Sequence, residues 1–478
     1  MKTIWIGIAT LALAGRAEAF CGFFVAGSSQ KLTNPASQVA LVRQGNRTTM
    51  TMSNTYQGPP ESFAMVVPVP VVLHEKDVKT LEPAVFDHVD ALSAPRLVEY
   101  WEQDPCEARV YKRKGATRGA ATGRVYDEER EDSDKLGVKI EAKFAVGEYQ
   151  ILILSAKDSG GLDAWLRQNK YTIPDGAGEA LAPYVRDKMK FFVAKVDIKK
   201  VKRNAEGVLQ LSPLRVTFEA SELRLPVRLG LLNAGAKQDL VVYVLSPGSR
   251  YEVANYPNVF IPTNLEVVDA VRKDFSSFYA ELFDATLAPR QGKAVVTEYA
   301  WQTTSCDPCP TPPLGDEEIE ILGADLGSGL MDDETPRRRP RGGGAGSGWV
   351  LTRLHARYDR SSLSDDLVFK EAPPVTGGRA QWNGTSDDAG ASINKNGANN
   401  FQGRYIIRHY WTGPVKCNDP VYGQWGGPPD GEQQKTVAAR GVALAPRGRV
   451  QLKSAVRSPV PTLGIAGQPP PRRRPQGQ

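Results

Sequence analysis

Alternating apolar and polar residues recur along this chain and predict a protein built mainly from β-strands. Residues 37–43 and 48–52 alternate on either side of a Gly45-Asn46 turn, which is typical of a β-hairpin. Pro68 and Pro70 lack N–H donors, so they place the strand of 62–73 at a sheet edge or beside a bulge. Similar runs predict further strands at 139–146, 148–155, 191–198, 214–218, 223–227, 239–245, 293–301, 349–358 and 403–408.

Helical periodicity is confined to fewer segments. Its clearest case is 269–287, where apolar residues at spacings of three and four share one face: Val271, Phe275, Phe278, Tyr279 and Leu282. Shorter helices are predicted at 162–168 and 179–189. Residues 78–102 predict two helices, the second starting at Ser93-Ala94-Pro95. We therefore expect a β-rich α+β fold, with mixed or antiparallel sheets and a few packed helices.

The same patterns divide the chain into five parts. Residues 1–19 resemble a signal peptide, and 20–325 form the main β-rich α+β domain. Residues 326–348 are rich in arginine and glycine and predict a flexible linker. Residues 349–454 either complete the main domain or form a small lobe, and 455–478 predict a disordered tail rich in proline and arginine.

The first residues predict export. Lys2, an apolar run at 3–14 and Ala17-Glu18-Ala19 have the order of a secretory signal peptide. That run is shorter than the about 20 residues of a spanning helix, and we expect no transmembrane segment in the mature chain. Phe20 precedes Cys21 where lipidation needs a small residue, so soluble export is favoured over lipidation. The expected location is the periplasm or the extracellular space, with or without association with the cell envelope.

Charge adds little to this picture. The chain of 478 residues has a formal net charge of +6, and a hydrophobic content of 41% fits a globular core. Because two low-complexity runs hold more positive charge than this total, the rest is close to neutral and a nucleic-acid partner is not expected. The runs consist of Arg337, Arg338, Arg339 and Arg341, and of Arg472, Arg473 and Arg474.

Cysteines offer the most specific chemistry. In an oxidising compartment all five are disulfide candidates, and an odd number leaves at least one unpaired: Cys21, Cys106, Cys306, Cys309 and Cys417. Cys306 and Cys309 form a Cys-x-x-Cys sequence, which is found in structural bridges, redox pairs and metal sites. Prolines around Cys309 argue against a redox pair at a helix start, and a structural bond is favoured. A metal site would need further ligands such as His409 and Cys417. We expect no cofactor.

No catalytic residue is identified. The histidines are His74, His88, His355 and His409, and no serine-hydrolase elbow, zinc-protease helix or phosphate-binding loop accompanies them. Residues 87–90 place His88 beside two aspartates, but helix neighbours one and two positions apart do not face each other, which favours a solvated face. The carboxylates of 317–320 are favoured as the acidic first turn of a short helix.

Aromatic residues gather in the last third of the chain. Most such residues fill a core, and the alternative is a surface that stacks on sugar rings or binds a partner protein. The group consists of Trp349, Trp382, Trp411 and Trp425 with Tyr405, Tyr410 and Tyr422.

Six separated blocks of the sequence carry a family resemblance: 20–26 (FCGFFVA), 63–70 (FAMVVPVP), 87–100 (DHVDALSAPRLVEY), 190–196 (KFFVAKV), 301–310 (WQTTSCDPCP) and 351–358 (LTRLHARY). Together they resemble an exported bacterial family, the domain of unknown function 2330. The resemblance implies a shared fold and an exported location, and it carries no assigned activity.

We therefore expect an exported, non-enzymatic envelope or secreted protein with a binding or structural role. Its partner would be an envelope protein or a glycan. The alternative is an exported thiol-redox or metal-dependent enzyme centred on the Cys306/Cys309 region.

Overall fold

The alternating segments form a large mixed sheet. The computed structural model describes residues 23–26, 36–54, 63–106, 137–169, 171, 173–203, 209–233, 237–307, 309–326, 348–379, 390–393, 397–429, 436–439, 442 and 445–469. Strands β2 (Ala36–Gln44) and β3 (Arg47–Asn54) form the expected hairpin. Gly45 has a φ of +59°, which suits a glycine in this turn.

The large sheet has eleven strands in the described residues, and Trp349–Tyr358 lies in its middle. That strand, β19, pairs antiparallel with β14 (Gln238–Pro247) on one side and β18 (Val295–Gln302) on the other. Because β14 also pairs parallel with β2, the sheet is mixed. Its other strands are β5 (Val78–Thr80), β12 (Leu214–Glu219), β16 (Asn258–Phe260), β21 (Val375–Gly377), β22 (Ser392–Ile393) and β23 (Asn400–Gln402).

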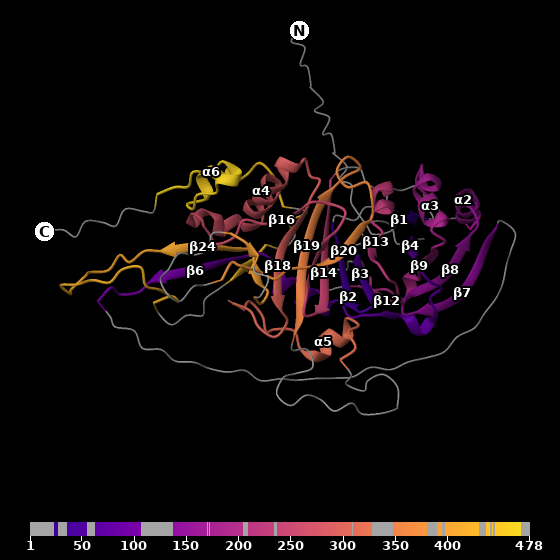
Figure 1. The fold of residues 1–478 in the computed structure, drawn as a ribbon, viewed down its shortest axis with the longest axis horizontal. Helices are drawn as coiled ribbons and strands as arrows, with labels where there is room; N and C mark the ends of the chain where they lie inside the picture. Colours follow the sequence, from indigo (N-terminus) through magenta and orange to yellow (C-terminus); the bar gives the residue numbers. More distant parts are fainter. Residues whose placement is uncertain are drawn as a thin grey trace, which may run out of the picture.

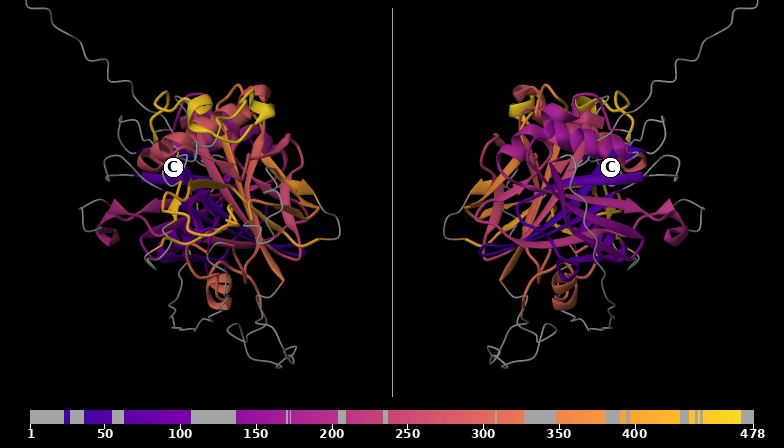
Figure 2. Two further views of the ribbon diagram at one scale, coloured as in Figure 1. Left: turned by 90° about the vertical axis from the view of Figure 1, so that its left-hand side faces the viewer. Right: turned by 90° about the vertical axis from the view of Figure 1, so that its right-hand side faces the viewer.

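A second sheet packs face to face against the first (Figure 1). Buried residues from both sheets form one core cluster, including Leu41 and Val242 from the large sheet and Val67 and Ile151 from the second. Helices α2 (Ser159–Gln168) and α3 (Ala177–Arg186) cover the outer face of this second sheet (Figure 2). Its strands are, in spatial order, β1 (Phe23–Ala26), β4 (Phe63–Val69), β9 (Lys190–Val196), β8 (Tyr149–Ala156) and β7 (Val138–Val146).

Three helices pack near the opposite face of the large sheet. α1 (Ala84–Ser93) and α5 (Asp316–Ile321) contribute apolar residues to a cluster with β14 and β19. α4 (Phe275–Leu287), which follows a 3-10 turn at Asp269–Asp274, confirms the clearest helix of the sequence. The shorter strands are β10 (Lys202–Arg203), β11 (Leu209–Gln210), β13 (Leu223–Leu225), β15 (Arg250–Val253), β20 (Leu367–Ala372) and β26 (Val437–Ala438).

A narrow arm extends from one end of the molecule, to the left in Figure 1. It consists of β6 (Arg96–Glu102), β24 (Arg404–His409), β25 (Trp425–Gly426) and the residues around the Cys106–Cys417 bond, and we call it the aromatic arm. β6 and β24 pair in parallel, and β17 (Leu265–Glu266) continues the sheet beside β24. The second helix expected within 78–102 was therefore wrong: the residues after Pro95 form a strand because β24 pairs with them.

The end of the chain is packed as far as the structure describes it. After α6 (Leu452–Ala455), Val456, Val460 and Ile465 are buried in the cluster around α4. The disordered tail expected from residue 455 therefore does not start there, because these apolar side chains find a tertiary partner that composition does not reveal. The signal peptide expected at 1–19 and all but the two end residues of the linker expected at 326–348 lie outside the described residues.

The expected β-rich α+β class, with mixed sheets and a few packed helices, is confirmed. Within the parts of the chain that the structure describes, no helix combines the length and the apolar character needed to cross a membrane.

The packing of the C-terminal segment is open to a direct test. Ile465→Ala removes a side chain that is 3% exposed, and we expect it to lower the free energy of unfolding by about 2–4 kcal/mol. Urea unfolding measures the change, with Thr462→Ala as the matched control because Thr462 is exposed in the same segment. Equal stability of the two variants would contradict this packing.

Candidate functional site

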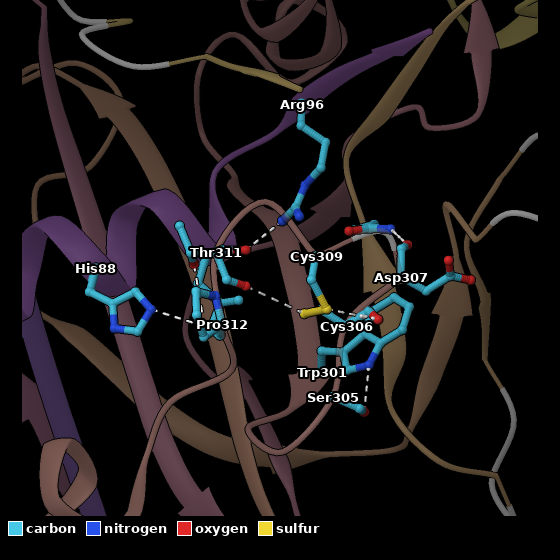
Figure 3. The surroundings of a disulfide bond; sticks show 11 residues. His88, Arg96, Trp301, Ser305, Cys306, Asp307, Cys309, Thr311 and Pro312 are labelled. Carbon is cyan, nitrogen blue, oxygen red and sulfur yellow. Dashed lines mark hydrogen bonds between the residues drawn. A yellow bond between two sulfur atoms is a disulfide. The ribbon is translucent and has the colours of Figure 1, made fainter. Parts of the chain in front are cut away.

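The Cys-x-x-Cys sequence forms a disulfide in the loop between β18 and α5 (Figure 3). Cys309 is exposed, whereas Cys306 is half-buried and packs against the apolar cluster beneath α1 and α5. The bond precedes the helix by several residues, since α5 begins at Asp316. A dipole at a helix start therefore does not act on these sulfurs as it does in thioredoxin-like sites.

The loop around this bond is anchored by hydrogen bonds that do not involve sulfur. The indole N–H of Trp301 donates to Ser305 Oγ at 3.2 Å, before the bond. The side-chain amide of Gln402 donates to the carbonyl oxygen of Asp307, between the two cysteines. The shape of the loop therefore depends on several contacts besides the disulfide.

His88 connects α1 to the far side of the same loop. Its Nδ1 lies 2.5 Å from Glu318 Oε1 and its Nε2 lies 2.9 Å from the carbonyl oxygen of Pro312. The hydrogen bond to Glu318 raises the pKa of His88, and the imidazolium form donates at both nitrogens. Glu318 lies in the acidic first turn of α5, which confirms the prediction for the carboxylates of 317–320. The helix face expected to be solvated thus makes a tertiary contact at His88.

The second disulfide joins Cys106 to Cys417 across the arm. Cysteine binds a metal ion as a free thiolate. Cys306 is joined to Cys309 and Cys417 to Cys106 in disulfides, so these sulfurs are not thiolates. In the described residues, no group of three His, Cys, Asp or Glu side chains is arranged to hold a metal ion. Cys21 lies outside the described residues.

The two disulfides restrain the chain to very different degrees. Cys306 and Cys309 are 3 residues apart, whereas Cys106 and Cys417 are 311 residues apart. In the chain-entropy account, a ring of the first size contributes about 2 kcal/mol and a ring of the second size about 6 kcal/mol. The bond across the arm is thus the main covalent restraint on the fold.

A chain of alternating charges crosses the interior beside the large sheet. Each neighbouring pair in it has a nitrogen–oxygen distance between 2.6 and 3.5 Å. The middle members are the most deeply buried, with Glu298 0% and His355 2% exposed. In order, the charge chain runs through Asp90, Arg353, Glu298, His355, Asp239, Arg357, Asp284 and Arg447.

Strand geometry explains why these charges meet. Arg353, His355 and Arg357 occupy alternate positions of β19, so their side chains share one face of the sheet. Glu298 is the extra residue of a β-bulge, because the pairing of β18 with β19 shifts between Thr297 and Tyr299. A bulge re-aims the side chain of its extra residue. The Glu298 carboxylate accepts from Arg353 Nε at 2.6 Å and lies 2.7 Å from His355 Nδ1.

His355 lies between two carboxylates, since its other nitrogen is 2.9 Å from Asp239 Oδ1. Burial alone lowers the pKa of His355, but attraction to Glu298 and hydrogen bonds to Asp239 and Glu298 outweigh it and raise the pKa to about 9. Burial alone raises the pKa of Glu298, but His355 and Arg353 lower it to about 2. At neutral pH the centre of the charge chain is therefore fully ionised.

The charged side chains of the charge chain form hydrogen bonds with one another and with neighbouring tyrosines. Glu298 accepts hydrogen bonds from Arg353, from the hydroxyl of Tyr279 on α4 and from His355. At the other end, the hydroxyl of Tyr243 donates to Asp90 of α1 at 2.9 Å. The arrangement joins α1 and α4 to the middle strands of the sheet, and its chemistry is that of an internal structural tie.

The aromatic arm carries the half-buried part of the aromatic group. Trp425 packs edge-on against Tyr410 with ring centroids 5.3 Å apart, and the Arg408 guanidinium lies 5.2 Å from the Trp425 ring centroid. Trp101 stacks on His409 at 4.6 Å. Besides these rings, the half-buried aromatic side chains of the arm are Tyr100, Trp411 and Tyr422.

Charged side chains interleave with the rings of the arm. Arg408 binds Glu266 at 2.9 Å, and His409 Nε2 lies 2.7 Å from Glu99 Oε2. Arg272 donates to the same Glu99 carboxylate at 2.6 Å. The rings of the arm thus lie beside charged side chains that are paired with one another.

The remaining aromatic residues of the sequence group lie elsewhere. Trp349 and Tyr405 are buried in two different core clusters. Trp382 lies outside the described residues. The structure therefore divides the group between the core and the arm.

Sequence reasoning missed the charge chain. Asp90 was grouped with a solvated helix face, and Arg353 and Asp239 received no role. One available signal was Glu298, a lone carboxylate inside the apolar run 293–301. A buried charge without a partner is costly, so such a residue indicates a partner on a neighbouring element.

Removing charge at the bulge tests the structural tie. Glu298→Gln keeps the side-chain shape but leaves Arg353 and His355 without their shared carboxylate, and we expect a loss of about 3–5 kcal/mol in the free energy of unfolding. Denaturant unfolding at neutral pH measures it. Glu179→Gln on α3 is the control, because Glu179 is exposed and its replacement should change stability by less than about 0.5 kcal/mol. Similar values for the two variants would be inconsistent with the tie.

The raised pKa of His355 predicts a pH dependence of stability. Its contribution is fully present below the ordinary pKa of 6.5 and is lost as the pH rises through about 9. The expected loss is about 3 kcal/mol, measured by urea unfolding across that range. His355→Gln should remove this loss of stability with rising pH. His88→Gln is the control and should still lose stability as the pH rises through about 9. An unchanged slope in His355→Gln would assign the effect to other groups.

Comparison with known proteins gives one match. A family described as an uncharacterized protein conserved in bacteria, DUF2330, matches residues 15–370, which is more than half of the chain. No curated protein matches the chain, and no solved structure does. The matched range includes α1, the bulge at Glu298, both cysteines of the short disulfide and all of β19. The chain therefore belongs to the bacterial family DUF2330.

Proposed function

We propose that this protein is exported to the periplasm or the outside of the cell and acts there, without catalysis, by binding an envelope glycan through its aromatic arm. The single observation that carries the proposal is the set of half-buried rings interleaved with charged side chains on the arm. Trp425, Tyr410 and Trp101 provide the rings, and Arg408 and Glu99 lie among them.

Export is supported by the order of charge, apolar run and small residues at 1–19. The two disulfides are compatible with an oxidising compartment, where such bonds persist.

The chemistry of the arm favours a glycan. The C–H faces of a pyranose pack against aromatic rings, and its hydroxyls need donors and acceptors close to those rings. The Arg408–Glu266 and His409–Glu99 pairs lie no more than one strand away from the strands that carry Trp425 and Trp101. The core of a protein–protein interface, in contrast, is depleted in charged residues. Rings and charges mixed on one surface are therefore better matched to a polyhydroxylated ligand.

The test is binding of the mature protein to purified envelope polysaccharides and peptidoglycan fragments, measured by calorimetry and by retention on immobilised glycan. Trp425→Ala removes one ring of the arm, and we expect it to weaken binding by at least about tenfold, or about 1.4 kcal/mol.

Asn418→Ala is the matched control, because Asn418 is exposed near Cys417 in the same arm. It should bind as the unaltered protein does. Unfolding curves of both variants separate a loss of binding from a loss of folding. Absence of glycan binding by the unaltered protein, or capture of an envelope protein instead, would overturn the proposal.

A further inference from the structure

The Cys306–Cys309 disulfide has one accessible and one sheltered sulfur. Cys309 is exposed to solvent, and Cys306 packs against the apolar cluster beneath α1 and α5. A thiolate from another molecule can therefore approach Cys309 Sγ, while Cys306 Sγ remains on the protein side of the bond. Exchange depends on such access to one sulfur.

Contacts other than the S–S bond hold this loop on both sides. Gln402 holds the main chain at Asp307, and the Asp307 carboxylate lies 3.9 Å from Arg379 Nε. His88 holds the loop at Pro312 on the other side. None of these contacts involves sulfur, so they keep the two cysteines close together when the S–S bond is reduced.

Cys106 is also exposed and Cys417 half-buried, so the two disulfides do not differ in access to one sulfur; they differ in what they hold. Cys106 and Cys417 join segments 311 residues apart at the end of the arm, whereas Cys306 and Cys309 join positions that the main chain already keeps near each other. Breaking the short bond therefore releases little chain freedom, and breaking the long bond releases much.

From this contrast we infer that the Cys306–Cys309 bond is a site of thiol–disulfide exchange with a dithiol, while the Cys106–Cys417 bond is structural. A thiolate of the dithiol attacks Cys309 Sγ and forms a mixed disulfide. The Cys306–Cys309 bond breaks, and its electron pair leaves on Cys306 Sγ, which takes up a proton. The second thiolate of the dithiol then attacks the first sulfur of the same dithiol, which is bonded to Cys309 in the mixed disulfide. Cys309 Sγ leaves with the electron pair of that bond and takes up a proton. The dithiol is oxidised to a disulfide, and the protein is reduced to a dithiol.

The first experiment exposes the mature, folded protein to dithiothreitol and, in a second arm, to a reduced Cys-x-x-Cys oxidoreductase. Samples are alkylated over time and the cysteine peptides are quantified by mass spectrometry. We expect the Cys306–Cys309 bond to be reduced at least about tenfold faster than the Cys106–Cys417 bond, with near-UV circular dichroism unchanged. Faster reduction only by dithiothreitol would assign the site to small dithiols, and faster reduction also by the oxidoreductase would extend it to protein dithiols.

A matched pair of variants tests the direction of attack. Cys306→Ser leaves the exposed thiol at Cys309, and Cys309→Ser leaves the sheltered thiol at Cys306. Glutathione disulfide should form a mixed disulfide with the first variant at least about tenfold faster than with the second. Equal reduction rates of the two native bonds, or reduction that requires unfolding, would overturn the inference. Because the readout is at the loop, its failure is distinct from a failure of glycan binding by the arm.

Discussion

Burial of the Glu298 carboxylate between Arg353 and His355 is the interaction on which the middle of the large sheet depends. A charge with no exposed surface is tolerable only when partners replace the water it has lost, and here two cations and a tyrosine hydroxyl do so. Such a site fixes the bulge in β18, because a shift in register would separate the carboxylate from both cations. The carbonyl oxygen of Glu298 also accepts from the N–H of Gly403, next to the arm strand β24.

Local patterns predicted the elements whose residues carry their own signal. The β2–β3 hairpin has its turn at Gly45, and α4 has five apolar residues at helical spacing. The prolines of 62–73 predicted a sheet edge or a bulge, but β4 lies between β1 and β9, and Pro68 is accommodated because β1 pairs with β4 only as far as Val66 in the described part. β6 was mistaken for a helix because Pro95 can either open a helix or follow the end of one. The neighbour that decides between the two, β24, is distant in sequence.

Tertiary context decided what the sequence left open. Alternation of Arg353, His355 and Arg357 shows that they share a face, but it does not show that α4 and α1 cover that face. The five cysteines were all disulfide candidates, and the pairing of Cys106 with Cys417 depends on the parallel alignment of β6 and β24. Likewise, composition could not divide the aromatic group into buried and half-buried rings, because burial is a property of the assembled sheets.

The position of the arm disulfide in the sequence also affects the order in which the two disulfides form. A chain is made from its N-terminus, so Cys106 exists as a thiol while the 311 residues that separate it from Cys417 are still to come. Cys306 and Cys309 appear during this interval and are two wrong partners available to Cys106. Closure of a very short ring is fast, and once these two are joined to each other they no longer compete for Cys106. The local bond thereby protects the long-range one, and the arm is the last part of the molecule to become covalently complete.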